Sequence, residues 1–246
     1  MIVKLTIHLD LPKEYKTTNI SSTLHGVLME NLPSENVEYI HQLSYNPLKQ
    51  RLIFHENQAT WEIVCFSSTL SQDIIQFISQ QTSLYIKHHQ LTVKVLNFNV
   101  ERIDIQSLID QSFSKDKLSR IVKLKIVTPM SFKSKGQYDI FLDIRKVFRS
   151  IMLQYDAFYK EYDMYDRDML NYIEENIKVI DYQLWSTKFH LEGVKIPSFK
   201  GNVVLKINGP LPFQQLVHFL IQFGELTGAG IKTSLGMGKY MLTTKH

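Results

Sequence analysis

The sequence predicts an α+β protein with two tandem ferredoxin-like (βαββαβ) domains, at residues 1–108 and 118–246. A strand–helix–strand–strand–helix–strand order of hydrophobic patterns fills the first half, and the same order begins again after residue 117. The stretch 224–240, GELTGAGIKTSLGMGKY, holds five of the ten glycines and falls between the last expected helix and the last expected strand. We therefore expect a glycine-rich loop near the end of the second domain.

The first domain is expected to begin with a strand at 2–9, whose residues alternate between apolar and polar, followed by a helix within 17–32. Three β-prone runs come next, and they are separated by Asn-Pro and by a short polar segment, which is typical of hairpin-connected strands. A segment with apolar residues at helical spacing and a final alternating strand complete the βαββαβ order. These later segments are EYIHQLSYNP (38–47), QRLIFH (50–55), ATWEIVCF (59–66), SQDIIQFISQQ (71–81) and QLTVKVLNFNV (90–100).

A polar stretch at 108–120 separates the two expected domains. The second domain is expected to open with a strand at 121–132 and a long helix at 143–162. A strand pair around Pro197 and Gly201 follows, and then a helix with Pro212 in its first turn and Gly224 at its C′ position. These last segments are LWSTKFHLEGVKIP (184–197), GNVVLKINGP (201–210), PFQQLVHFLIQFG (212–224) and the strand KYMLTT (239–244).

Composition narrows the class of protein. The chain has 246 residues, of which 44% are hydrophobic, so it can bury a large core. No apolar run approaches the roughly 20 residues of a membrane span, and the N-terminus does not resemble a signal peptide, so we expect a cytoplasmic location. Cys65 is the single cysteine, which excludes a disulfide framework and a cysteine-based zinc site; we expect it in the core.

Charge is unevenly distributed along the chain. Residues 1–116 carry nine Lys or Arg against twelve Asp or Glu, whereas residues 117–246 carry nineteen against twelve. A basic half raises the odds of a polyanionic partner such as nucleic acid or a membrane surface, although solvated protein surfaces also show such a balance.

The glycine-rich stretch is a candidate ligand site. Glycine inside a regular element costs stability, so several close together indicate positive φ angles or a ligand against the main chain. A phosphate-binding loop is excluded because the Gly-Lys-Ser/Thr ending is missing, and a dinucleotide fingerprint is excluded because no strand precedes the run and no helix follows it. Contact with RNA and packing against the domain's own sheet both remain open.

Several segments resemble the CRISPR-associated endoribonuclease family Cas six, which belongs to the repeat-associated RNA-processing superfamily. The spacing of Gly224, Gly228, Gly230, Gly236 and Gly238 at this topological position is the specific part of the resemblance. Further similarity lies in VTPMSFK (127–133), FRSIMLQYDAFY (148–159), LHGVLMENL (24–32) and EYIHQLSYNPLKQRLIF (38–54).

This resemblance implies a metal-independent endoribonuclease without a cofactor. It would cut precursor CRISPR RNA within each repeat by attack of the 2′-hydroxyl, which leaves a 2′,3′-cyclic phosphate and a 5′-hydroxyl. Its expected partners are the repeat RNA and, transiently, an interference complex, and we expect a monomer or a homodimer. The alternatives are a non-catalytic RNA-binding subunit of such a complex and an unrelated ferredoxin-like binding module.

His41 is the first candidate for catalysis because it occupies the place of the family's catalytic histidine, and imidazole suits proton transfer near neutrality. Lys49 and Arg51 follow closely and are expected to reach one cleft with it, where cations stabilise the charged phosphorane. His25 on the first helix is the second histidine candidate. Many family members carry a tyrosine on that helix, and this sequence has none. Either Tyr45 or Tyr39 from the loop or His25 is expected to fill the role, or no such residue is needed.

The expected RNA-binding residues lie mainly in the basic half. Backbone N–H groups of the glycine loop and the side chains beside them would approach phosphates. Lys133 lies in an expected loop, and Arg145 and Arg149 lie early in a long helix, where cations oppose the helix dipole and an anionic ligand would explain them. The full set is Arg51, Lys133, Arg145, Arg149, Gly228, Gly230, Lys232, Thr233, Ser234, Gly236, Gly238 and Lys239.

Overall fold

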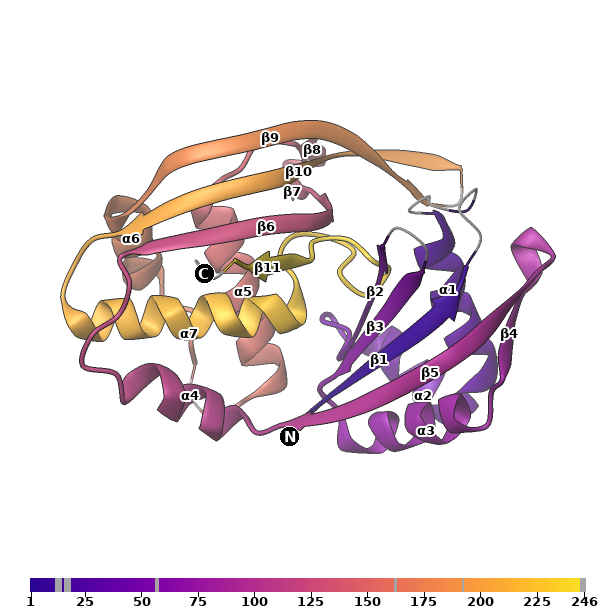
Figure 1. The fold of residues 1–246 in the computed structure, drawn as a ribbon. Helices are drawn as coiled ribbons and strands as arrows, with labels where there is room; N and C mark the ends of the chain where they lie inside the picture. Colours follow the sequence, from indigo (N-terminus) through magenta and orange to yellow (C-terminus); the bar gives the residue numbers. More distant parts are fainter. Residues whose placement is uncertain (12–14, 16–18, 56–57, 162, 192, 244–246) are drawn as a thin grey trace. The chain divides into compact units, whose positions relative to one another are not determined.

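A computed structural model describes residues 1–11, 15, 19–55, 58–161, 163–191 and 193–243. The chain forms two compact units, each with its own sheet and helices (Figure 1). The first unit contains Met1–Asp104, His190–Gly193 and Ser234–Gly236. The second contains Ile105–Phe189, Val194–Thr233 and Met237–His246. The parts of the expected elements at Thr17, Thr18, Tyr162, Glu192 and Thr244 lie outside the described residues.

The first unit has the strand order β2-β3-β1-β5-β4, and all neighbouring strands are antiparallel. Without β4, this is the order of a ferredoxin-like sheet, in which the first strand lies between the third and the last. Helices α1 and α3 are the two crossovers of the βαββαβ order, and α2 is an additional helix. The elements are β1 (Ile2–Asp10), α1 (Asn19–Asn31), α2 (Ser34–Gln42), β2 (Leu48–Phe54), β3 (Ala59–Cys65), α3 (Ser68–Ser79), β4 (Ser83–Ile86), the 3-10 turn Lys87–His89 and β5 (Leu91–Ile103).

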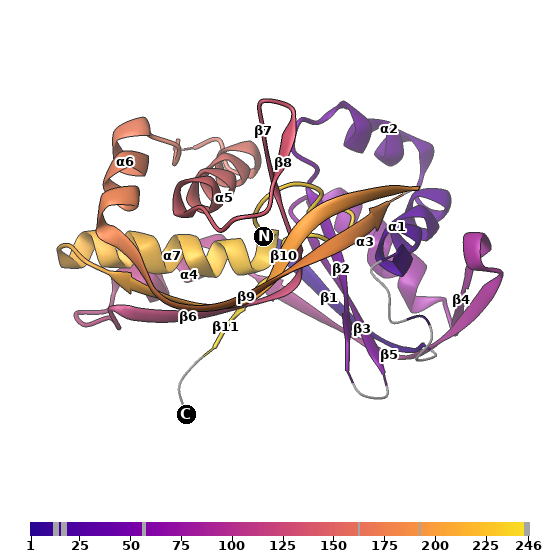
Figure 2. The same cartoon turned by 90° about the horizontal axis from the view of Figure 1, so that it is seen from above.

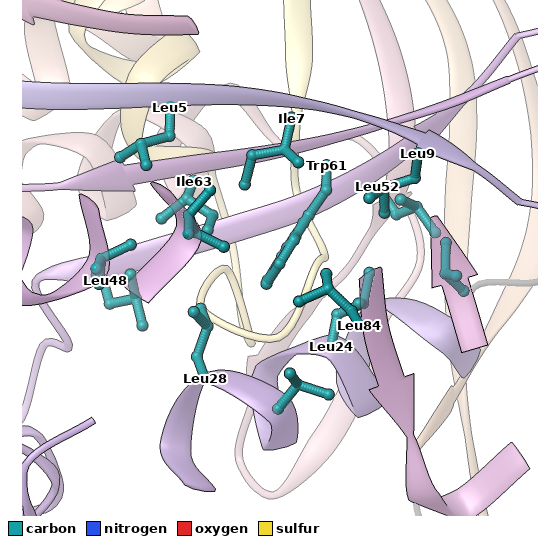
Figure 3. Packing of buried hydrophobic residues seen from close by; sticks show 14 of the residues in the cluster. Leu5, Ile7, Leu9, Leu24, Leu28, Leu48, Leu52, Trp61, Ile63 and Leu84 are labelled. Atoms are coloured by element: carbon teal, nitrogen blue, oxygen red, sulfur yellow. The ribbon is translucent and has the colours of Figure 1, made fainter. Parts of the chain in front are cut away.

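The helices of the first unit cover one face of its sheet. Alternate residues of each strand point to opposite faces, so β1 buries Leu5, Ile7 and Leu9 against the helices (Figure 3). Trp61 of β3 is fully buried in this cluster, and its indole N–H donates to Oε1 of Gln50 at 2.8 Å. The cluster also contains Cys65, as expected, and burial raises the pKa of its thiol to about 12.

The second unit has the strand order β11-β6-β10-β9, which is again the ferredoxin-like arrangement. Helices α5 and α7 contact each other on one face of this sheet, and α4 packs against α7 (Figures 1 and 2). The elements are α4 (Ile105–Phe113), β6 (Ile121–Met130), β7 (Phe132–Ser134), β8 (Gln137–Asp139), α5 (Ile144–Phe158), α6 (Arg167–Asn176), β9 (Ile177–Leu191), β10 (Val194–Ile207), α7 (Leu211–Thr227) and β11 (Tyr240–Leu242). Both tandem ferredoxin-like folds expected from the sequence are confirmed.

Several local expectations were wrong. Residues 38–42, expected in a strand, belong to α2, and the polar stretch at 108–120 includes the end of α4. The turn between β9 and β10 falls after Leu191, so Pro197 and Gly201 lie inside β10 rather than between two strands. Strands β4, β7 and β8 and helix α6 were not anticipated.

The end of α7 also differs from expectation. Gly224 lies inside the helix, and a Cβ there would approach the hydroxyl of Tyr240 and Cδ1 of Ile151 to about 2.2 and 2.5 Å. Gly228 ends the helix instead, and its N–H donates to the carbonyl of Gly224 at 2.8 Å. Gly224 is therefore needed for close packing. Among the described helices, none combines the length and the apolar character that a membrane crossing requires.

Candidate active site and glycine-rich loop

Helix α1 carries two buried polar atoms without partners. Oγ of Ser21 and Nδ1 of His25 make no hydrogen bond to any described residue. The two residues are four positions apart, so they lie on one face of the helix. Burial, and then the nearby charge of His41, lowers the pKa of His25 to about 4. Its imidazole is therefore neutral at pH 7 and can accept a hydrogen bond.

His41 lies in the last turn of α2 and is exposed. Its neighbour Ile40 is buried in the core and fixes the helix against the sheet. Tyr45 follows in the bend between α2 and β2 and is half-buried. The structure thus brings His25 and His41 near each other, on the side of the first sheet that the helices cover.

Lys49 and Arg51 point to the opposite face of that sheet. Gln50, which lies between them on β2, donates to the carbonyl of Ser21 on α1 at 2.7 Å, so the alternation of β2 directs its neighbours away from the helices. Burial, and then the charge of Arg51, lowers the pKa of Lys49 to about 7. The expectation that both cations share one cleft with His41 does not agree with this placement.

Arg51 is engaged by the protein itself. Its guanidinium is fully buried and forms an ion pair with Glu62 of β3, which is also buried. Lys4 of β1 lies 3.9 Å from Glu62 and 3.5 Å from Glu101 of β5. These four side chains form a row of alternating charges across four strands, which we call the charge row. An RNA contact by Arg51 would therefore compete with its ion pair to Glu62.

The two ends of the glycine-rich segment are fixed by contacts within the second unit. The N–H of Gly230 donates to Oγ of Ser150 on α5 at 2.9 Å. The N–H of Gly238 donates to the carbonyl of Pro129 on β6 at 2.9 Å. A Cβ at Gly230, where φ is +92°, would lie 2.3 Å from the carbonyl oxygen of Ser131. These glycines serve packing, which was the second of the two readings of the sequence.

The middle of the segment is a turn with free donors. The N–H of Met237 donates to the carbonyl of Lys232 at 3.2 Å and closes the turn. The backbone N–H groups of Ser234, Leu235 and Gly236 make no hydrogen bond within the described part of the chain. Successive free N–H groups can bind an anion.

This turn lies next to α1. Residues 234–236 belong to the first unit, and a Cβ at Gly236, where φ is +114°, would lie 1.9 Å from Oγ of Ser21. Only glycine allows the backbone to approach the helix this closely. Ser21, one helical turn before His25, was missed by the sequence reasoning; its small side chain and its i, i+4 spacing to His25 were the available signals.

The side chains of the loop differ in availability. Lys232 is exposed and Ser234 is half-buried. Thr233 is buried, with its hydroxyl 3.5 Å from Oε1 of Gln154. Lys239 is buried, and its ammonium donates to the carbonyl of Glu225 at 2.8 Å. Of the two loop lysines expected to contact RNA, Lys232 is therefore accessible, whereas the ammonium of Lys239 is engaged within the protein. Gly228 accepts a hydrogen bond from Gln154 Nε2 at 3.0 Å.

The remaining expected RNA contacts are separate from this turn in sequence and differ in their surroundings. Lys133 on β7 is exposed, with its ammonium 5.8 Å from the centre of the Tyr138 ring. Arg149 is exposed on α5. Arg145 donates to Glu174 of α6 at 2.8 Å, so it joins two helices instead of standing free. Among the described residues, no group of three or more His, Cys, Asp or Glu side chains is arranged to hold a metal ion.

Two ferredoxin-like sheets, with a glycine-rich segment between the last helix and the last strand, define a tandem ferredoxin-like protein. Residues 124–240 match the model of the family described as CRISPR-associated endoribonuclease Cas6. A Cas6 endoribonuclease of Streptococcus thermophilus is 29% identical over 229 residues, which cover 92% of each chain. One of Mycobacterium tuberculosis is 25% identical over 238 residues, 95% of this chain and 75% of that protein.

A solved Cas6 product complex matches with a TM-score of 0.81 at 18% identity, and the match covers 99% of this chain and 100% of that one. At this identity the structural match shows a common fold. The chain is thus similar to CRISPR-associated Cas6 endoribonucleases in sequence and in fold.

Proposed function

We propose that this protein is an endoribonuclease that cuts precursor CRISPR RNA within its repeats without a metal ion. The similarity to Cas6 endoribonucleases supports this function. The observation that carries the site is the pair of unpartnered buried atoms on α1, Ser21 Oγ and His25 Nδ1, close to the exposed His41. A substrate that filled this position would satisfy both atoms.

The proposed reaction uses the RNA as its own nucleophile. The 2′-oxygen forms a bond to phosphorus, and the bond from phosphorus to the 5′-oxygen breaks. A proton leaves the 2′-hydroxyl, and a proton is added to the 5′-oxygen. The products are a 2′,3′-cyclic phosphate and a 5′-hydroxyl, so the protein must move protons and stabilise the negative charge of the phosphorane.

We assign proton transfer to His41, because it is exposed and a substrate can reach it. His25, neutral at pH 7 because of its lowered pKa, would accept a hydrogen bond and orient the reacting hydroxyl. Tyr45, half-buried after α2, would donate a hydrogen bond beside them. We assign Lys49 no role in the reaction, because the alternation of β2 directs its side chain to the other face of the sheet.

Phosphate binding is assigned to the turn at 233–236. The free N–H groups of Ser234, Leu235 and Gly236 would donate to phosphate oxygens, and the exposed Lys232 would add a positive charge. Lys133 and Arg149 remain proposed RNA contacts, whereas Arg51, Arg145 and Lys239 are held by contacts within the protein. We further propose that the protein acts in the cytoplasm, where precursor RNA is made, and passes its product to an interference complex.

Incubation of the protein with repeat RNA in EDTA tests the proposal. We expect cutting at one position in each repeat, and end analysis should find a cyclic phosphate and a 5′-hydroxyl. A 2′-deoxy substitution at the scissile nucleotide should block cutting, because it removes the nucleophile. Tight binding without cutting would instead identify a non-catalytic RNA-binding subunit, and cutting of the 2′-deoxy substrate would contradict the mechanism.

A further inference from the structure

A glutamine lies on the helix-covered face of the first sheet, where the alternation of β2 favours an apolar residue. Leu48, Gln50 and Leu52 share this face, and the two leucines belong to the apolar cluster under the helices. The side chain of Gln50 is 0% exposed. A buried amide is unfavourable unless its oxygen and its N–H groups find partners. Apolar packing alone therefore does not explain a glutamine at this position.

Both ends of the Gln50 amide are hydrogen-bonded. The indole N–H of Trp61 donates to Oε1 at 2.8 Å, and Nε2 donates to the carbonyl oxygen of Ser21 on α1 at 2.7 Å. Figure 3 shows Trp61 pointing from the sheet toward Leu24 and Leu28 of α1. Because an indole can only donate, Trp61 fixes which end of the amide is the acceptor. The donor end must then face α1.

The carbonyl of Ser21 belongs to the turn of α1 that carries His25. In an α-helix the N–H of each residue donates to the carbonyl four residues earlier, so the backbone N–H of His25 bonds to this same oxygen. A carbonyl oxygen has two lone pairs and can accept both bonds. The Gln50 amide is thus linked to the backbone of His25 through a single atom. A shift of α1 relative to β2 would move the imidazole with it.

Gln50 also lies close to the turn at 233–236. A Cβ at Gly236 would lie 1.9 Å from Oγ of Ser21 and 3.9 Å from the backbone oxygen of Gln50. Ser21, Gln50 and residues 234–236 all belong to the first unit. The turn therefore packs against the same two residues that the amide joins, and one buried hydrogen bond connects both parts of the candidate site.

We propose that Gln50 is a positioning residue for the cleavage reaction: its amide, oriented by Trp61, holds the first turn of α1 so that Ser21 meets the turn at 233–236 and the His25 imidazole keeps its place. A buried polar network with its partners in place makes an arrangement rigid and unique. Since Gln50 is not exposed, it acts through α1 and does not touch RNA. The inference rests on the proposed function and deepens it.

Replacement of the amide by an apolar side chain of similar length tests the proposal. Gln50→Met removes both hydrogen bonds and keeps most of the packing. The single-turnover cleavage rate at saturating repeat RNA should fall by about 10-fold to 10²-fold, because a small displacement of reacting groups is enough for such a loss. Affinity for the uncleavable 2′-deoxy substrate should stay near native, since the phosphate-binding N–H groups are retained. A native cleavage rate in the folded variant would overturn the proposal.

A second glutamine provides the matched control. Gln215 of α7 in the second unit is also buried, and its Nε2 donates to the carbonyls of Phe113 and Lys115 at 2.8 and 3.0 Å. Gln215→Met is the same chemical change and removes the same kind of hydrogen bond to the backbone. This variant should cut at the native rate. An equal loss of rate in both variants would overturn the proposal, because the cause would then be a general loss of stability.

The titration of His25 reports the position of α1 directly. Burial lowers the pKa of this imidazole to about 4, so its NMR signal should not titrate between about pH 8 and pH 6 in the wild type. A loosened α1 lets in water, so Gln50→Met should raise the pKa of His25 toward 6.5. Comparison with the spectrum of His25→Gln assigns the signal among the nine histidines. An unchanged titration in Gln50→Met would overturn the proposal.

A conservative variant tests the donated hydrogen bond itself. Gln50→Glu keeps the size of the side chain and the acceptor for Trp61, and it provides a second route if Gln50→Met does not fold. Only the protonated carboxyl can donate to the carbonyl of Ser21, and burial raises the pKa of a carboxyl. The cleavage rate of Gln50→Glu, divided by the wild-type rate at the same pH, should therefore rise as the pH falls. A ratio that does not change with pH would overturn the role of this bond.

The two readouts separate this inference from the proposed function. A wild-type protein that cuts, together with native cleavage by Gln50→Met, would keep the endoribonuclease and remove the positioning role. A wild-type protein that does not cut, together with a raised His25 pKa in Gln50→Met, would remove the endoribonuclease and keep Gln50 as the residue that positions α1.

Discussion

The two sheets share one topology but differ in the face that their helices leave uncovered. On the first sheet, Arg51, Glu62, Lys4 and Glu101 alternate in sign across four strands, and Arg51 and Glu62 are buried. On the second sheet, Lys123 and Lys125 of β6 and Lys206 of β10 are exposed, and none of the three takes part in an ion pair among the described residues. The first face pairs its charges within the protein, whereas the second presents positive charge to solvent.

This difference shows that a repeated fold constrains only one face of each sheet. The apolar residues of alternate positions specify the helix-covered side in both units, so the other side is free to vary. In the first unit, charges on that side hold strands together, and two buried polar atoms without partners, Ser21 Oγ and His25 Nδ1, lie on α1. In the second unit, the exposed side presents positive charge. We therefore expect changes in the first unit to affect stability and the proposed chemistry, whereas changes to the exposed lysines of the second sheet should leave stability nearly unchanged.

The largest effect is expected from His41→Ala. Loss of a proton-transfer group should lower the single-turnover cleavage rate by about 10² to 10⁴. Affinity for the uncleavable 2′-deoxy substrate should stay near the native value, because the phosphate contacts remain. His88→Ala, which removes another exposed histidine of the first unit, is the control and should cut normally. A native rate for His41→Ala would remove His41 from the mechanism.

Glu62→Gln should be the most damaging change in the charge row. It leaves the buried guanidinium of Arg51 without its carboxylate, which typically costs about 3 to 5 kcal/mol of the free energy of unfolding. Glu101→Gln is the matched control, because Glu101 is exposed and its pair with Lys4 should contribute less than about 1 kcal/mol. Urea denaturation of both variants measures the difference; equal losses would mean that burial of the row is unimportant.

Acid should destabilise the first unit partly through His25. The folded pKa of about 4 is below the ordinary value of 6.5, so the unfolded chain binds the proton more readily. The contribution of His25 to stability is present above pH 6.5 and is lost as the pH falls toward 4, by about 3 kcal/mol in total. His25→Gln should remove this part of the pH dependence, measured as the difference between urea denaturation curves of the two proteins. Parallel pH dependences would contradict the burial of a neutral imidazole.

Two glycines should respond in opposite directions to alanine. Gly236→Ala forces a side chain against Ser21 at a φ of +114°, and such strain costs about 1 to 3 kcal/mol and should move the turn and weaken RNA binding. Gly26 lies in α1 with no heavy atom within 4 Å of an added Cβ, so Gly26→Ala should raise the stability by about 0.5 to 1 kcal/mol. Thermal denaturation and RNA titration measure both. Native RNA affinity in Gly236→Ala would separate the turn from the RNA site.

The element order was predictable because its patterns are strong. Alternation in β1, β5, β6 and β10 and the helical period of α3, α5 and α7 are visible without any tertiary information. Helix α2 was not predictable in this way: EYIHQ is rich in β-prone residues, and the helix forms because Ile40 packs into the core. Tertiary burial overrode local propensity there.

The candidate site was predicted only in part. The choice of His25, His41 and the glycine run as candidates followed from residue type and resemblance. The placement of Lys49 and Arg51 depends on which residues of β2 face the helices, and the sequence does not show this for a strand that is buried on both faces. Ser21 was missed, because it becomes a candidate only through Gly236, which is distant in the sequence.

By itself, the sequence determined that two sheets form and, in alternating strands such as β1 and β6, which residues are buried, because hydrophobic periodicity is a local property of the chain. The tertiary structure decided which residues meet: Gly236 with Ser21, Arg51 with Glu62, and Lys125 with Asn202. These pairings depend on strand register and on contacts across long sequence separations, which no local pattern encodes.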